Sequence, residues 1–125
     1  ILLCSIRGVI EKYEAGKRGA ECGHDKDFQA NCFAKAPLLV ARYGGQPDFL
    51  QHCEAAIRVQ QNNDDAVRWG LAGAQVLEKV VVEGWSVVKA LEWAASAPSV
   101  AADVQKHLKL ALSSKASPIK GERRR

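Results

Sequence analysis

Methionine is absent from this 125-residue sequence, and the first residue is isoleucine. Because translation starts at methionine, we expect the chain to be a processed product or a piece of a longer protein. No basic segment is followed by an apolar run and a small-residue cleavage site, so no signal peptide is predicted. Uncharged stretches such as residues 94–102 are far shorter than the roughly 20 apolar residues of a membrane-spanning helix. We therefore expect a cytoplasmic protein that does not cross a membrane.

No Cys-x-x-Cys pair occurs among the four cysteines, which are Cys4, Cys22, Cys32 and Cys53. Their wide and irregular spacing fits neither a zinc site nor a redox-active pair. Three of them lie among apolar neighbours, where a thiol behaves as a small hydrophobic group, and this favours a reduced intracellular protein. Cys22 and His24 could form one corner of a metal site, but two ligands are too few to predict one.

The sequence also lacks a glycine-rich phosphate loop, the helix motif of zinc proteases and the serine motif of α/β-hydrolases. The three histidines lie on different predicted elements, and we interpret His52 and His107 as surface residues of amphipathic helices. Asp25 and Asp27 flank Lys26 in a long loop, and we interpret both as solvated charges. Spacing alone therefore predicts no catalytic group.

The formal net charge of +4 comes from one end of the chain. Residues 115–125 contain five basic residues and one acidic residue, so the first 114 residues are neutral. We expect this segment to be a disordered tail behind a single domain at residues 1–114. No aromatic residues are interleaved with its basic ones and no nucleic-acid motif is present, so nucleic acid is not expected as a partner. Docking of the tail on an acidic partner is a separate hypothesis.

Apolar residues recur at steps of three and four over most of the chain, which is the spacing of one helical face. This spacing predicts helices over residues 2–15, 37–43, 47–60, 64–83, 85–98 and 99–112. Asn62 and Asn63 are suited to cap the fourth helix, and Pro37 and Pro47 would each open one. No run shows the sustained alternation of a strand. The predicted fold class is all-α, a compact bundle of about six helices.

Two segments are not explained by helical periodicity. Residues 29–37 (QANCFAKAP) place an amide, a thiol and a cation just before a proline-opened helix, where backbone N–H groups attract anions. Residues 58–64 (RVQQNND) contain four consecutive amide side chains between two apolar helices. Amide groups make directional hydrogen bonds with little charge, which suits a polar ligand such as a ribose or a base. Helix capping explains one of these amides but not four.

These segments, together with residues 18–22 (RGAEC) and 54–67 (EAAIRVQQNNDDAV), resemble the middle of the ADP-ribosylglycohydrolase family. The resemblance covers about residues 1–98 and points to the branch that contains the eye-lens J-crystallins and selenoprotein J. It rests on an ordered pair of motifs, Asn-Cys-Phe-x-Lys-x-Pro followed by Arg-Val-x-Gln-Asn-Asn.

The resemblance implies an all-α fold that binds two magnesium ions and cleaves N- or O-glycosidic bonds of ADP-ribosyl groups. The family's metal-binding carboxylates belong to an early Asp-Asp-Thr-type motif and a late Gly-Asp-x-Asp-Thr motif, and neither occurs here. Mg²⁺ is therefore expected in the full-length protein, with its ligands outside this chain. The fragment by itself would be inactive and would supply part of a pocket for ADP-ribose or an ADP-ribosylated substrate.

The family's ligand loop falls on residues 32–37, where Lys35 replaces the usual arginine and keeps its charge without its bidentate geometry. The family's Thr-His pair falls on Gln60 and Gln61, which cannot titrate. The substrate-binding residues implied by the resemblance are Asn31, Cys32, Phe33, Lys35, Gln61 and Asn62. The alternative is a crystallin-like structural protein that keeps the fold without the activity.

Overall fold

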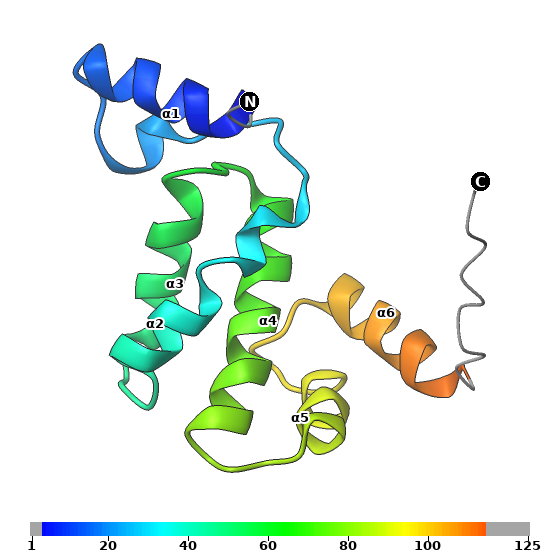
Figure 1. Ribbon diagram of the computed structural model, residues 1–125. Coiled ribbons are helices and arrows are strands. Elements are labelled where there is room, and N and C mark those ends of the chain that lie inside the picture. Colours follow the sequence, from blue (N-terminus) through cyan, green and yellow to red (C-terminus); the bar gives the residue numbers. More distant parts are fainter. Residues whose placement is uncertain (1–3, 115–125) are drawn as a thin grey trace, which may run out of the picture.

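The computed structural model describes residues 4–114, and within this range the chain forms helices and no strand (Figure 1). The elements are α1 (Cys4–Glu14), η1 (Gly19–Cys22), η2 (Ala30–Phe33), α2 (Ala36–Tyr43), α3 (Phe49–Arg58), α4 (Asp64–Val81), α5 (Val87–Ala94) and α6 (Ala102–Ser113). Elements η1 and η2 are single 3₁₀ turns inside the loop that joins α1 to α2. Over these residues the structure confirms the all-α class and the expectation of about six helices. The basic segment 115–125 lies outside the described residues.

Helix α4 is the centre of the bundle, with α2 and α3 on one side and α5 and α6 on the other (Figure 1). Its start is the predicted one, because the Asn63 side-chain oxygen accepts a hydrogen bond from the backbone N–H of Ala66 at 2.8 Å. Its first turn carries Asp64 and Asp65, whose charges favour the positive end of a helix. The turn that follows the end of α4 contains Gly84 at φ +68°, a conformation that favours glycine.

The ends of the other helices differ from the predicted ones by a few residues. Pro37 lies in the first turn of α2 as expected, but Pro47 lies in the turn before α3. Helix α5 begins only at Val87, because the Ser86 hydroxyl accepts a hydrogen bond from the N–H of Lys89 and caps the helix there. Helix α6 begins at Ala102, three residues later than predicted.

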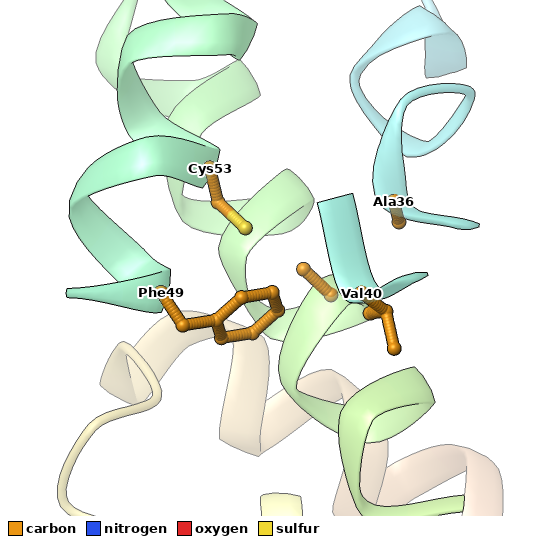
Figure 2. Packing of buried hydrophobic residues seen from close by; sticks show 5 residues of the cluster. Ala36, Val40, Phe49 and Cys53 are labelled. Carbon is orange, nitrogen blue, oxygen red and sulfur yellow. The ribbon is translucent and has the colours of Figure 1, made fainter. Parts of the chain in front are cut away.

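The core is divided into three clusters that all include residues of α4. Figure 2 shows the first, which α4 forms with α2 and α3 and which contains Ala36, Val40, Phe49, Cys53 and Ala74. The second lies between α4, α5 and α6, and its buried members are Ala72, Ala94, Ala97, Val100 and Val104. The third joins η2, α3 and α4 through Cys32, Ile57, Ala66 and Val67. Because α4 is covered on more than one side, the single apolar stripe expected for it is only part of its buried surface.

A buried amide joins α4 to the segment between α5 and α6. Gln75 is 4% exposed, and its side-chain nitrogen donates to the carbonyl oxygens of Leu71 and Ser99. The Ser99 hydroxyl in turn donates to the Gln75 side-chain oxygen at 2.5 Å. Both ends of this amide are therefore satisfied, as a buried polar group requires.

The Cys53 thiol, which lies in the first cluster, makes the stability of the folded chain sensitive to alkali. Burial, with a smaller contribution from Glu78, raises the pKa of Cys53 from 9.0 to about 11. The folded chain therefore keeps this proton at pH values where the unfolded chain loses it. The stabilisation is complete below pH 9 and is lost as the pH rises toward 11, by up to about 3 kcal/mol.

We expect Cys53→Ala to have a flatter dependence of unfolding free energy on pH between 9 and 11 than the unchanged chain. Urea unfolding at a series of pH values measures this dependence. Each chain is compared with its own stability at pH 8, so that the loss of stability caused by removing the sulfur atom cancels. Equal slopes for the two chains would show that the thiol does not titrate differently on folding.

Candidate functional site, the loop before α2 and the cleft beside it

We refer to the four consecutive amide residues Gln60, Gln61, Asn62 and Asn63 as the amide run. This run holds the long loop between α1 and α2 against the end of α3. The backbone N–H of His24 donates to the carbonyl oxygen of Gln60 at 2.9 Å, and the N–H of Asn62 donates to the carbonyl oxygen of His24 at 3.0 Å. This reciprocal pair of bonds joins two segments that are 36 residues or more apart along the chain. Lys12 adds a side-chain bond from α1 to the carbonyl oxygen of Gly23 at 2.6 Å.

Gln61 lies at the centre of this contact and is fully buried. Its side-chain nitrogen donates to the carbonyl oxygens of Asp27 at 3.0 Å and Gln29 at 2.8 Å. Asn63 donates a further bond to the Asp27 carbonyl oxygen at 2.9 Å, in addition to capping α4. The Gln61 side-chain oxygen has no hydrogen-bond partner among the described residues. With no exposed surface, Gln61 acts here as a support for the loop, which differs from the ligand contact expected for it.

The remaining two amides of the run also have partners within the chain. The Lys35 ammonium donates to the Gln60 side-chain oxygen at 2.7 Å, and burial lowers the pKa of Lys35. Arg58 donates to the Asn62 side-chain oxygen at 3.1 Å, and it also pairs with Glu54 at 2.8 Å and with Asp64 at 2.8 Å. Each of the four consecutive amides therefore makes at least one hydrogen bond within the fold, while the Gln61 side-chain oxygen is left without a partner among the described residues.

The expectation that Asp27 is a solvated loop charge is wrong, because this residue is only 9% exposed. Its carboxylate accepts a hydrogen bond from the N–H of Gln29 at 3.0 Å and another from the Asn31 side chain at 3.4 Å. The side chain and the carbonyl oxygen of Asp27 thus both stabilise the turn that leads into η2. Asp25, by contrast, is exposed.

A cleft of about 550 Å³ lies between this loop, the first turns of α4 and the first half of α6. Three aromatic side chains line it, namely Phe28, Phe33 and Trp69. Phe28 is 66% exposed and Phe33 is 41% exposed, which is unusual for side chains of this size. Clefts of this volume with aromatic walls are typical of small-molecule sites.

The polar side of the cleft is a set of four side chains from α4 and α6. Arg68 lies between two carboxylates, bonding Asp103 at 3.1 Å through its Nε and Asp65 through an Nη. His107 hydrogen-bonds the Asp103 carbonyl oxygen through Nδ1 at 2.8 Å and packs edge-on against Trp69. Because a carbonyl oxygen only accepts, Nδ1 carries a hydrogen and donates it in this bond.

The structure brings only two of the expected substrate-binding residues to this cleft. Cys32 and Phe33 line it, with Cys32 4% exposed and the pKa of its thiol raised by burial. Asn31, Lys35, Gln61 and Asn62 are not among the lining residues. Sequence reasoning missed the polar side of the cleft. The only signals for it were the spacings of three between Asp65 and Arg68 and of four between Asp103 and His107.

The described part of the chain offers no metal centre, since no group of three histidine, cysteine or acidic side chains gathers within residues 4–114. The two carboxylates of the cleft already share the guanidinium of Arg68, which occupies the place that a cation would take. The residues of the cleft therefore do not fit Mg²⁺. Among the same residues, no helix has the length and apolar character needed to span a membrane.

Comparison with known proteins supplies no relative that shares this geometry. No protein family, no curated protein and no solved structure matches the chain.

Proposed function

We propose that this chain is part of an ADP-ribosylglycohydrolase-like protein and that its cleft binds an ADP-ribosyl group. One observation carries the proposal. Cys32 and Phe33 of the first motif line a cleft whose opposite wall is the start of α4, directly after the amide run of the second motif. The cleft volume of about 550 Å³ is in the range of small-ligand sites.

The side chains of the cleft suit the base and the sugars of such a ligand better than its phosphates. An adenine ring can stack on an exposed aromatic ring such as Phe28, and stacking of this kind is worth about 1–3 kcal/mol per base. Ribose hydroxyl groups can donate to the free lone pairs of Asp65 and Asp103. Arg68 is already shared by two carboxylates, so a diphosphate gains little from it. We therefore expect adenosine to bind nearly as well as ADP-ribose, with little dependence on salt.

The proposal for this chain concerns binding, because the acidic motifs that the family uses for hydrolysis do not occur in it. Its residues would orient the ligand and exclude water from one side of it. Hydrolysis by the full-length protein is a further proposal. Mg²⁺ would be bound there by residues outside this chain.

A crystallin-like structural protein is the second candidate, and the bonding of the amide run favours it. Lys35 and all four amides are engaged within the fold, so the residues expected to contact ligand already stabilise the protein. This candidate predicts that neither ADP-ribose nor adenosine binds to the chain.

We expect Phe28→Ala to weaken ADP-ribose binding by about 5- to 150-fold, because the variant loses the stacking surface. Isothermal titration measures the affinity of each chain. The matched control is Tyr13→Ala, which removes another exposed aromatic ring, on α1 and away from the cleft, and should leave the affinity unchanged. An unchanged chain that binds neither ADP-ribose nor adenosine would reject the proposal in favour of the structural protein.

A further inference from the structure

Two apolar hollows continue from the cleft along α4. One has a volume of about 210 Å³ and lies between α4, α5 and α6, where Leu91, Val104 and Leu108 contribute to its walls. The other has a volume of about 330 Å³ and lies between α4, the start of α2 and the start of α5. All of their lining side chains are aliphatic or aromatic, apart from the glycine and proline that they also contain.

The hollows and the cleft adjoin one another. Phe33 lines all three, Trp69 lines the cleft and the first hollow, and Gly73 and Val76 line both hollows. The ring of Phe33 lies on α4 at Gly73, where a Cβ atom would come within 2.6 Å of it. We refer to the two hollows together as the apolar trough, and its defining residues are Phe33, Gly73, Val76, Val80, Val87 and Leu108.

We infer that the apolar trough binds the alkyl chain of a neutral amphiphile whose hydroxyl-bearing head lies in the cleft. The trough has no charged or hydrogen-bonding side chain except the indole of Trp69, so its walls match a hydrocarbon chain. The polar side of the cleft contains two carboxylates and one guanidinium, and the formal charges of these three groups sum to −1. This excess of acceptors favours a head that donates hydrogen bonds, and it disfavours a carboxylate head placed directly beside Asp65 and Asp103.

The head of such an amphiphile would compete with an ADP-ribosyl group for the cleft. Its affinity, however, comes from the trough and not from stacking on Phe28, so the two proposals can fail separately. A neutral sugar on a single alkyl chain has the chemistry that the trough and the cleft require together. A second copy of the chain is the rival occupant, and it is an outcome of the test.

The first test is titration of the chain with n-alkyl β-D-glucosides from butyl to octyl, each below its critical micelle concentration. We expect affinity to rise roughly fourfold for each added methylene, the increment for burial of one such group. Glucose alone, which has no chain, should bind far more weakly than the octyl glucoside. An affinity that does not depend on chain length would overturn the inference, whether or not ADP-ribose binds.

Two adjacent valines on α5 provide the matched pair of variants. Val87 lines the trough and is 57% exposed, whereas Val88 is 59% exposed and lines neither hollow. We expect Val87→Gln to weaken octyl glucoside binding about tenfold and Val88→Gln to change it less than twofold. Val76→Gln, placed where the two hollows meet, should weaken it further.

Equal effects of Val87→Gln and Val88→Gln would overturn the inference, since the chain would then bind without a defined site. Sedimentation equilibrium of the same variants tests the rival occupant. A dimer that is lost in Val87→Gln and kept in Val88→Gln would assign the trough to a second copy. If the unchanged chain, Val87→Gln and Val88→Gln are all monomers and affinity depends on the length of the alkyl chain, the amphiphile is supported.

Discussion

Gly23→Ala is expected to lower the free energy of unfolding by about 3 kcal/mol, the largest effect of any change considered. A Cβ atom at this position would lie 2.0 Å from the carbonyl oxygen of Arg58, and 2.8 Å and 2.9 Å from the Cβ and backbone nitrogen of Asn62. The backbone of Gly23 has φ −66° and ψ 153°, which alanine adopts readily, so the cost is steric contact alone.

Relief of this contact requires the loop to move away from the end of α3. Such a movement would break the two backbone bonds of His24 and the bond from Lys12 to the Gly23 carbonyl oxygen. Urea unfolding followed by circular dichroism measures the change in stability. Gly8→Ala is the matched control, because nothing lies within 4 Å of a Cβ there, and alanine in helix α1 should stabilise the chain by about 0.5–1 kcal/mol. Equal stabilities of the two variants would mean that the loop does not pack on α3.

Gln61→Leu is expected to destabilise the chain by about 1–3 kcal/mol, although leucine is similar in size and more apolar. The substitution removes both bonds from the Gln61 nitrogen, so the Gln29 carbonyl oxygen loses the donor that it has here. The Asp27 carbonyl oxygen keeps its bond from Asn63. The cost is therefore that of one newly unpaired acceptor and a loosened turn before η2, less the gain from removing the Gln61 side-chain oxygen, which has no partner among the described residues.

Gln51→Leu serves as the control for this change, since Gln51 is exposed on the neighbouring α3, and its effect should stay within about 0.5 kcal/mol. Differential scanning calorimetry compares the two variants with the unchanged chain. If Gln61→Leu melts at the temperature of the unchanged chain, the amide does not support the loop. In that case the ligand contact implied by the family resemblance becomes the better interpretation of Gln61.

The amide run shows where sequence reasoning was insufficient. Capping of α4 by Asn63 could be predicted, because it depends on residues three apart on one helix. The partners of Gln61 are the carbonyl oxygens of Asp27 and Gln29, more than 30 residues away, and no local spacing identifies them. A polar run that looked suited to a ligand instead makes hydrogen bonds to a distant part of the chain, although the Gln61 side-chain oxygen has no partner among the described residues.

Local patterns in the sequence by themselves determined the all-α class, the approximate helix ranges and the start of α4, because each depends on neighbours within one or two turns. Only the tertiary structure decided which residues form the cleft. Asp103 and His107 of α6 meet Asp65 and Arg68 of α4 because the two helices pack on a shared core. Periodicity identifies the face that a helix buries, but the angle at which helices cross depends on how their side chains interlock. The contacts that build the cleft arise from that packing.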